Sequence, residues 1–287
     1  MLSDIKIYEV GPRDGLQNLK KRFSTSEKVH FIGLLAKSGL NSIEIGSFVN
    51  PRFVPTMADS EAVFREVLPF FDKKMEFGAL IPNEKGLKRA ISAGATHFNA
   101  FFSPSDEFNR RNLGKSRIEA VEMLQTAFSG IPKENIRVYV SCAFGCPFEG
   151  PISDDKLITC VQEAASIGNT VVLCDTVGSV YPALLRHVLN ICGYIPENLA
   201  LHLHEGPKGR TGLFENVKIA YDFGICEFDS SIGGLGGCPF MPNTGGNLAT
   251  EDLVEWAESN NIDCNIKLTD LEAPLNFLNG IIGGLLV

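Results

Sequence analysis

Short runs typical of β-strands recur along the chain, and helical patterns separate them. The expected strands are Ile5–Val10, Ser42–Gly46, Met75–Leu80, Thr96–Phe102, Ile136–Ala143, Thr170–Cys174, Leu199–His204 and Cys226–Ser230. Several are apolar with little alternation, as strands covered on both faces are, and each precedes a segment long enough for a crossover helix. We therefore expect eight parallel strands.

Eight such βα units with no linker or low-complexity break fit an α/β fold of the (β/α)8 TIM-barrel type in size and rhythm. We expect one domain over residues 1–287, with the barrel over about 4–262 and a short C-terminal extension over about 263–287. The extension would hold an extra helix and an apolar tail within Leu268–Val287. A doubly wound open sheet is the alternative, but no GxGxxG motif follows the first strand.

Helix boundaries are marked at several places. Ser24 and Glu27 match a capping box, and an apolar stripe at helical spacing continues until Gly39. Ser153 and Thr250 each precede two acidic residues, which favour the positive end of a helix, so we expect helices to start there.

The charge balance restricts the kind of partner. A formal net charge of −8 and a pI near 5.2 disfavour nucleic acid and anionic membrane surfaces, which reward a basic face. No apolar run reaches the ~18 residues of a membrane span, and because the first expected strand begins almost at the N-terminus, we expect no leader. We expect a small-molecule partner and a cytoplasmic protein, bacterial in preference to a processed organellar matrix enzyme.

The eight cysteines contain no CxxC pair, and most lie among apolar residues. We interpret them as reduced thiols of an intracellular protein; disulfides are the alternative, although a chain of this length does not need them.

Polar residues gather where the expected strands end, which is where active sites of this fold lie. Arg13, Asp14 and Gln17 follow the first strand, Glu44 lies near the end of the second and Asp175 follows the sixth. Arg13 is a candidate cation for a substrate carboxylate or oxyanion, against the alternative of a surface Arg–Asp pair. Glu44, Asp175 and Gln17 either orient the neighbouring groups or are structural.

A metal site is indicated by four residues. His202 and His204 point to the same face of one strand, so a metal can bind a nitrogen of each. Asp14 and Asn247 follow the first and eighth strands, which neighbour the seventh in a closed barrel. Mixed nitrogen and oxygen ligands suit Mg²⁺, Mn²⁺, Zn²⁺ or Fe²⁺.

The stretch Gly233–Asn247, GGLGGCPFMPNTGGN, holds six glycines and two prolines around Cys238. Such a loop is shaped to present a side chain, and the obvious one is Cys238. The alternative is a glycine-rich surface loop with an incidental cysteine.

Six motifs, spread over nearly the whole chain, resemble those of the 3-hydroxy-3-methylglutaryl-CoA lyase family of metal-dependent lyase barrels. They are EVGPRDGLQN (9–18), IEIGSFVNPRFVPTM (43–57), YVSCAFGCPFEG (139–150), CDTVGS (174–179), HLH (202–204) and GGLGGCPF…GGNLATEDLV (233–254). The first and last are the most specific.

The resemblance implies a retro-Claisen cleavage of 3-hydroxy-3-methylglutaryl-CoA to acetyl-CoA and acetoacetate, as in leucine degradation. It implies that a divalent metal, Mg²⁺ or Mn²⁺, binds Asp14, His202, His204 and Asn247. It further implies Arg13 as the essential arginine, Glu44 and Asp175 as supporting acids, and Cys238 as the catalytic loop cysteine. Arg13 and Gln17 would contact the acyl-CoA substrate, and a homo-oligomer, as a dimer, is expected.

The chain departs from the family pattern after the two histidines, where Glu205–Gly212 is longer than usual and begins with Glu in place of Asp or Asn. Lys208 and Arg210 in this loop are expected to contact a CoA phosphate, unless the loop is simply solvated. The departure leaves a related 3-hydroxyacyl-CoA open as the substrate.

Two further functions stay open. One is a Claisen synthase of the same barrel group, although such enzymes carry Glu-Arg where this chain has Gly237-Cys238. The other is a barrel that binds metal or CoA ester without turnover, which would have no use for a proton-donating thiol.

Overall fold

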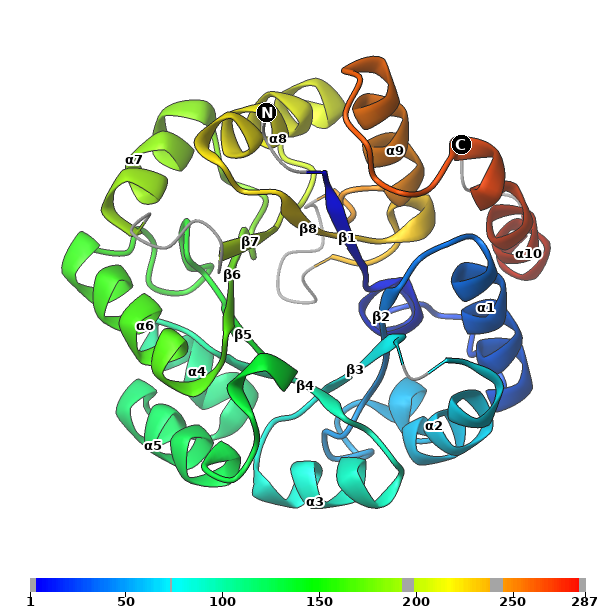
Figure 1. The fold of residues 1–287 in the computed structure, drawn as a ribbon. Helices are drawn as coiled ribbons and strands as arrows, with labels where there is room; N and C mark the ends of the chain where they lie inside the picture. The colour runs from blue at the N-terminus through cyan, green and yellow to red at the C-terminus, as the bar shows by residue number, and fades with distance from the viewer. Residues whose placement is uncertain (1–3, 73, 193–198, 238–244, 284–287) are drawn as a thin grey trace.

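The computed structural model describes residues 4–72, 74–192, 199–237 and 245–283. Eight parallel strands close into a barrel in chain order, with β8 paired to β1 (Figure 1). They are β1 Lys6–Glu9, β2 Ser42–Ser47, β3 Glu76–Leu80, β4 His97–Phe102, β5 Ile136–Val140, β6 Thr170–Cys174, β7 Leu199–His202 and β8 Glu227–Ser230. The expected TIM barrel is confirmed, and only β2 extends beyond its expected run, by one residue.

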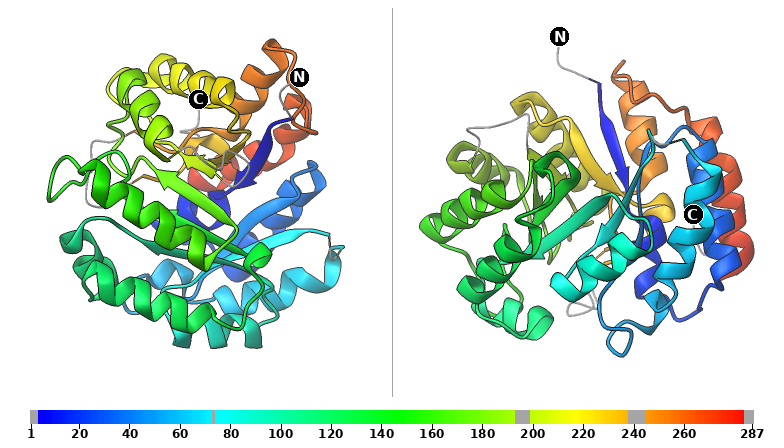
Figure 2. Two further views of the ribbon diagram at one scale, coloured as in Figure 1. Left: turned by 60° about the vertical axis from the view of Figure 1, so that its left-hand side comes forward. Right: turned by 60° about the horizontal axis from the view of Figure 1, so that its bottom comes forward.

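Ten helices within the described residues surround the barrel (Figure 2). They are α1 Thr25–Lys37, α2 Ser60–Val67, α3 Glu84–Ser92, α4 Asp106–Leu113, α5 Arg117–Phe128, α6 Asp154–Ile167, α7 Pro182–Cys192, α8 Gly209–Phe223, α9 Thr250–Ser259 and α10 Glu272–Ile282. A π-helical turn, η1 (Gly11–Gly15), follows β1. None of the described helices has the length and apolar character needed to cross a membrane.

The expected helix starts are largely confirmed. Ser24 and Glu27 form both halves of the capping box of α1, and α6 begins directly after Ser153, whose side chain makes no capping bond. The helix α9 begins at Thr250 itself, so that Ala249 holds the cap position. The hydroxyl of Thr250 donates to Glu9 instead.

The C-terminal extension forms the helix α10, which lies beside α1 (Figure 1). The Phe277 ring packs edge-on against His30, with centroids 4.8 Å apart, and stacks near Phe31 at 6.2 Å. These ring contacts pack α10 against α1. The last four residues of the expected extension, 284–287, lie outside the described part of the chain.

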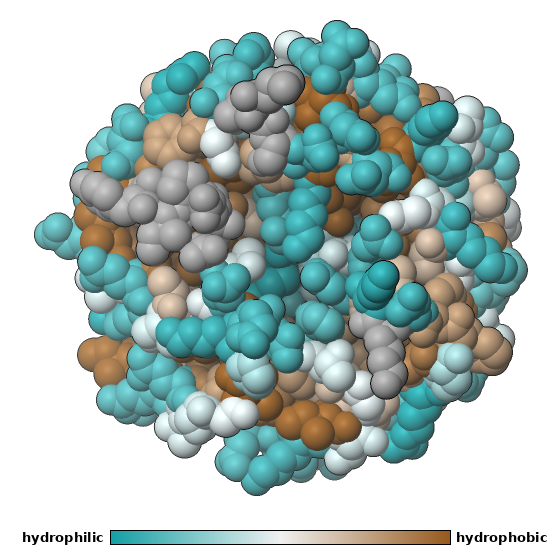
Figure 3. Space-filling model, in the orientation of Figure 1, coloured by the Kyte–Doolittle hydropathy of each residue, from teal (hydrophilic) through white to brown (hydrophobic). Residues whose placement is uncertain are grey.

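Charged side chains fill the centre of the barrel at the end where the strands begin, and Figure 3 shows hydrophilic residues gathered there. Lys6 Nζ lies 3.6 Å from Glu76 and 3.5 Å from Glu227. Deeper inside, Arg137 donates to Glu227 and, at 2.6 Å, to Asp229 Oδ1. Opposite charges thus satisfy one another along the barrel axis.

Glu9 joins three segments near the other end of the barrel. Its buried Oε1 accepts hydrogen bonds from the backbone of Gly11 (2.7 Å) and of Ile232 (3.0 Å). Its Oε2 accepts one from Thr250 Oγ1 at 2.5 Å. The turn after β1, the loop after β8 and the start of α9 therefore share one carboxyl group. Burial raises the pKa of Glu9 to about 7.

This raised pKa predicts a pH-dependent stability. The pKa of Glu9 is about 7 in the folded protein and 4.5 ordinarily, so its contribution to stability is complete below pH 4.5 and is lost as the pH rises towards 7. Glu9→Gln keeps the shape and cannot ionise. The free energy of unfolding of this variant, relative to the wild type, should rise by up to roughly 3 kcal/mol across that range. Urea unfolding at a series of pH values measures it, and a pH-independent difference would contradict the role given to Glu9.

Candidate active site

Three of the four predicted metal ligands converge where the strands end. Asp14 lies in η1, His202 is the last residue of β7, and His204 follows two residues later. One carboxylate oxygen of Asp14 and one ring nitrogen of each histidine lie within 4.8 Å of one another. The two Nε2 atoms are 3.2 Å apart. The spacing of the histidines thus predicted their common face correctly.

Asn247 completes this group. Its Nδ2 donates to Asp14 Oδ2 at 2.8 Å and to the Leu235 carbonyl at 2.9 Å. Its Oδ1 is buried and has no hydrogen-bond partner among the described residues. Such an unsatisfied buried oxygen requires an explanation, and a ligand at this point would supply one.

The glycine-rich loop approaches these ligands closely at Gly236. Its backbone has a φ of +117°, and a Cβ there would lie 2.3 Å from Asn247 Nδ2 and 3.0 Å from Asp14 Oδ2. Any other residue at this position would displace one of the two side chains. Gly237 is one of the residues that line the cavity beside Asp14, His202 and His204. Cys238 lies outside the described residues.

Arg13 is buried beside Asp14 and held by two carboxylates. Its Nε donates to Glu44 Oε2, and its Nη1 donates to Asp14 Oδ1 at 2.6 Å. Glu44 is itself fixed, because Asn99 Nδ2 donates to its other oxygen at 2.7 Å. Burial raises the pKa of Glu44. Burial also acts to raise the pKa of Asp14, but Arg13 and the two imidazoles outweigh it and lower that pKa below its ordinary value.

His204 is held in the form that a metal requires. Burial and, to a smaller extent, the neighbouring His202 together lower its pKa to about 4. The imidazole is therefore neutral at pH 7, with a lone pair on one nitrogen.

Asp175 and Gln17 lie nearby but have other contacts. Burial raises the pKa of Asp175 to about 6, and its two oxygens accept from the backbone of Ser179 (2.9 Å) and of Val180 (3.1 Å). Asp175 therefore fixes the turn after β6. Gln17 lines the cavity, and its carbonyl accepts from Thr56 at 2.8 Å.

Lys208 and Arg210 do not line the cavity. Both lie at the start of α8. Arg210 forms a bidentate ion pair with Asp252 of α9, in which Nε donates to Oδ2 at 2.5 Å and Nη2 pairs with Oδ1. This bidentate partner already occupies the guanidinium. The structure thus does not bring these two cations to the other expected site residues.

Asp229 is a site residue that the sequence analysis did not identify. Its Oδ2 lies 3.1 Å from His202 Nδ1, and its Oδ1 accepts from Arg137 at 2.6 Å. The available signal was an acidic residue in the strand run CEFDS, which also holds Glu227. Its meaning depends on the pairing of β7 with β8, which sets His202 opposite Asp229.

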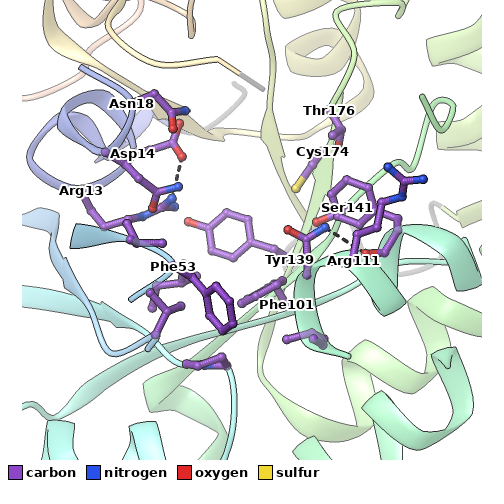
Figure 4. Close-up of a pocket in the computed structure, with 18 of the residues that line it drawn as sticks. Arg13, Asp14, Asn18, Phe53, Phe101, Arg111, Tyr139, Ser141, Cys174 and Thr176 are labelled. Carbon is purple, nitrogen blue, oxygen red and sulfur yellow. Dashed lines mark hydrogen bonds and ion pairs between the residues drawn. The ribbon is translucent and has the colours of Figure 1, made fainter. Parts of the chain in front are cut away.

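An open cavity of about 800 Å³ extends from Asp14, His202 and His204 to the surface. Figure 4 shows Arg13 and Asp14 on one side of it and Ser141 and Thr176 on the other. The buried Arg13, His202 and His204 and the half-buried Asp14 form its closed end, and exposed residues including Arg22, Phe53 and Arg110 form its rim. A cavity of this size suits a small-molecule ligand.

The chain matches the HMGL-like family model over residues 4–277. It is 36% identical over 284 residues to hydroxymethylglutaryl-CoA lyase of Bacillus subtilis (strain 168), covering 97% of this chain and 93% of that protein. It is 37% identical over 279 residues to the mitochondrial hydroxymethylglutaryl-CoA lyase of Homo sapiens, covering 96% and 84%.

Solved structures agree. The crystal structure of the Bacillus subtilis HMG-CoA lyase matches with a TM-score of 0.91 at 34% identity, covering 99% of this chain and 95% of that one. An HMG-CoA lyase from Acinetobacter baumannii, in complex with coenzyme A and 3-methylmalate, matches with a TM-score of 0.88 at 34% identity, covering 97% and 91%. On the strength of both the family model and these full-length relatives, the chain belongs to the HMGL-like family.

Proposed function

We propose that this chain, acting as one catalytic domain, is a carbon–carbon lyase that cleaves 3-hydroxy-3-methylglutaryl-CoA to acetyl-CoA and acetoacetate. The observation that carries the proposal is the convergence of Asp14, His202, His204, Asn247 and Arg13 at the closed end of one cavity. Relatives named as this lyase align over nearly the full chain, which supports the same substrate.

Asp14, His202, His204 and Asn247 fit a divalent cation. Two imidazole nitrogens and a carboxylate oxygen lie within 4.8 Å of one another, and the adjoining Asn247 has a buried amide oxygen with no hydrogen-bond partner in the described part of the chain. We propose Mg²⁺ or Mn²⁺, since oxygen and nitrogen ligands with open positions suit both. When bound, the cation supplies Lewis acidity that makes the substrate hydroxyl easier to deprotonate.

The bond that breaks joins C2 and C3 of the acyl group. Asp14, whose lowered pKa keeps it ionised at neutral pH, takes the proton of the C3 hydroxyl. The C3 oxygen then becomes the ketone of acetoacetate, and the electron pair of the C2–C3 bond moves to C2. The product on that side is the enolate of acetyl-CoA.

Arg13 is positioned to stabilise this enolate. Two of its nitrogens are fixed by Glu44 and Asp14, while Nη2 donates to no side chain or carbonyl within the described residues. This remaining donor is available to stabilise the developing charge on the thioester oxygen. Because Glu44 and Asp14 hold the guanidinium in place, little reorganisation is needed during the reaction.

The enolate must gain a proton at C2, and the Cys238 thiol is the proposed donor. The described flanks of its loop end at Gly237 and resume at Gly245, and Gly237 already lines the cavity. A thiol with an ordinary pKa near 8.5 is a suitable acid for a carbon atom with carbanion character.

The reaction is directly testable. Purified protein with 3-hydroxy-3-methylglutaryl-CoA and Mg²⁺ or Mn²⁺ should form equal amounts of acetoacetate and acetyl-CoA, and EDTA should stop the reaction. Cleavage that continues in the presence of EDTA would contradict the proposed requirement for a metal ion. Failure with this ester, but turnover of another 3-hydroxyacyl-CoA, would change the substrate and keep the chemistry.

Cys238→Ser should lower kcat by roughly 10²- to 10⁴-fold, because a hydroxyl is a far weaker acid than a thiol, and should leave KM near the wild-type value. Steady-state kinetics measures both constants. Cys226→Ser is the matched control on β8's flank, away from the cavity, and should keep wild-type turnover. Unchanged kcat in the Cys238 variant would remove its assigned role.

Asp229→Asn should weaken Mn²⁺ binding by roughly 10- to 100-fold, because Asp229 orients His202 and makes it a better ligand. Electron paramagnetic resonance of free Mn²⁺ measures the Kd without any substrate. Asp222→Asn, on the exposed side of α8, is the control. If the Asp229→Asn variant has a normal Tm and binds Mn²⁺ as tightly as the wild type, Asp229 acts only as the ion-pair partner of Arg137.

A further inference from the structure

Two polar side chains lie buried in the barrel beside Glu44, the carboxylate that holds Arg13. Asn99 is in β4 and Tyr8 is in β1, and neither lines the cavity. Asn99 Nδ2 donates to Glu44 Oε1 at 2.7 Å and to the Tyr8 hydroxyl oxygen at 2.9 Å. That hydroxyl lies 3.2 Å from Asn99 Oδ1, to which it donates. Both hydrogens of the Asn99 amide are therefore in use, one of them on Glu44.

The barrel leaves a space for the contact between Asn99 and Glu44. These residues lie in β4 and β2, which β3 separates (Figure 1). The residue of β3 that pairs with Glu44 is Gly78. A Cβ at Gly78 would overlap the Tyr8 hydroxyl and would lie 3.0 Å from Asn99 Nδ2. Since glycine has no Cβ, the amide can reach across β3 to the carboxylate.

Tyr8 is held in place from the face of its ring. The guanidinium carbon of Arg137 lies 3.9 Å from the centroid of the Tyr8 ring. Arg137 is itself fixed, because it donates to Asp229 Oδ1 at 2.6 Å. A cation over an aromatic face is attracted to it. The ring is thus fixed at the position from which its hydroxyl orients the Asn99 amide.

The Glu44 carboxylate needs such a support to keep one orientation. The last torsion angle of a glutamate side chain has a broad energy minimum, so an unsupported carboxylate turns easily. In Glu44 each oxygen has its own donor, Asn99 on Oε1 and Arg13 Nε on Oε2. An apolar residue at position 99 would leave Oε1 buried without that donor, and the carboxylate would turn towards Arg13. The Arg13 guanidinium, including its Nη2, would then shift.

We propose that Asn99 and Tyr8 are positioning residues for the cleavage: through Glu44 they fix the orientation of Arg13 in which Nη2 stabilises the enolate. This inference deepens the proposed function, since it takes Arg13 to act on the thioester oxygen. It also separates two supports of the active site. Asn99 and Tyr8 act on Arg13, whereas Asp229 acts on His202.

Steady-state kinetics with 3-hydroxy-3-methylglutaryl-CoA tests the two residues. Asn99→Leu should lower kcat by roughly 10- to 100-fold and leave KM near the wild-type value, because the misplaced donor serves a charge that develops only in the transition state. Tyr8→Phe, which loses only the hydroxyl, should lower kcat by a smaller factor. The matched control is Phe98→Leu, which shortens the neighbouring side chain of β4, near the ring of Phe128 in α5, and should keep wild-type kcat.

A double variant separates positioning from a general structural role. Glu44→Gln removes the carboxylate through which Asn99 acts. Adding Asn99→Leu to Glu44→Gln should therefore lower kcat by no more than about threefold further. If Asn99→Leu lowers kcat by the same large factor in both backgrounds, it does not act through Glu44 and the proposal is overturned.

The Nε–H signal of Arg13 reports the same arrangement without any substrate. In protein made with isotope-labelled arginine, NMR detects the side-chain N–H groups, and Arg13→Lys identifies the Arg13 signal by its loss. This N–H donates to the buried Glu44, so it should exchange slowly with solvent. Asn99→Leu and Tyr8→Phe should shift the signal and speed its exchange by about tenfold or more, whereas Phe98→Leu should leave it unchanged.

A wild-type Arg13 signal in both variants would overturn the proposal, and so would wild-type kcat in both. If Asn99→Leu does not fold, Tyr8→Phe carries both measurements. If the wild type does not cleave the ester but the Arg13 signal responds as expected, the proposed function fails while the positioning of Arg13 by Asn99 and Tyr8 is supported.

Discussion

The buried guanidinium of Arg13 is the group on which the rest of the active site depends. A charge removed from water costs several kcal/mol unless partners of opposite charge surround it. Arg13 has two, Glu44 and Asp14, and Asp14 in turn accepts from Asn247. One chain of contacts therefore links β2, the turn after β1 and the segment after β8. Removing Arg13 would leave the carboxylates of Glu44 and Asp14 without their cationic partner next to the reacting groups.

A second chain of charges reaches the same centre from the opposite end of the barrel. It runs from Lys6 through Glu227 and Arg137 to Asp229 and His202. The barrel interior is thus only partly apolar, and its polar contents set the orientation of one imidazole. In this fold the interior side chains that fill the barrel also act as supports for the residues above them.

The sequence was sufficient to predict those features that depend on residues close together along the chain. Period and length of the apolar runs predicted the closed parallel barrel, and the one-residue spacing of His202 and His204 predicted their shared face. Fold knowledge then placed Asp14 and Asn247 beside them, because strands 1, 7 and 8 adjoin in a closed barrel. No individual contact had to be known for these conclusions.

Residues whose role depends on a partner distant in sequence were harder to predict. Asp229 gains its meaning from the register of β7 and β8, and Arg210 lies outside the cavity, where it pairs with Asp252, 42 positions away. Thr250 looked like a helix cap, but the hydrogen-bonding need of a buried carboxyl 241 positions away determined its contact. Charge and spacing alone do not reveal which partner a polar group will find.

Part of the cavity rim, with Phe53 after β2 and Arg110 in α4, lies on other segments than the closed end, where Asp14 follows β1 and His202 ends β7, and this division has an evolutionary consequence. Substitutions in the segments after β2 and β4 can alter the opening without replacing Asp14, His202 or His204. A lineage could therefore exchange the carrier attached to its substrate while conserving the bond that is broken. Divergence in such a barrel should begin at one side of its mouth.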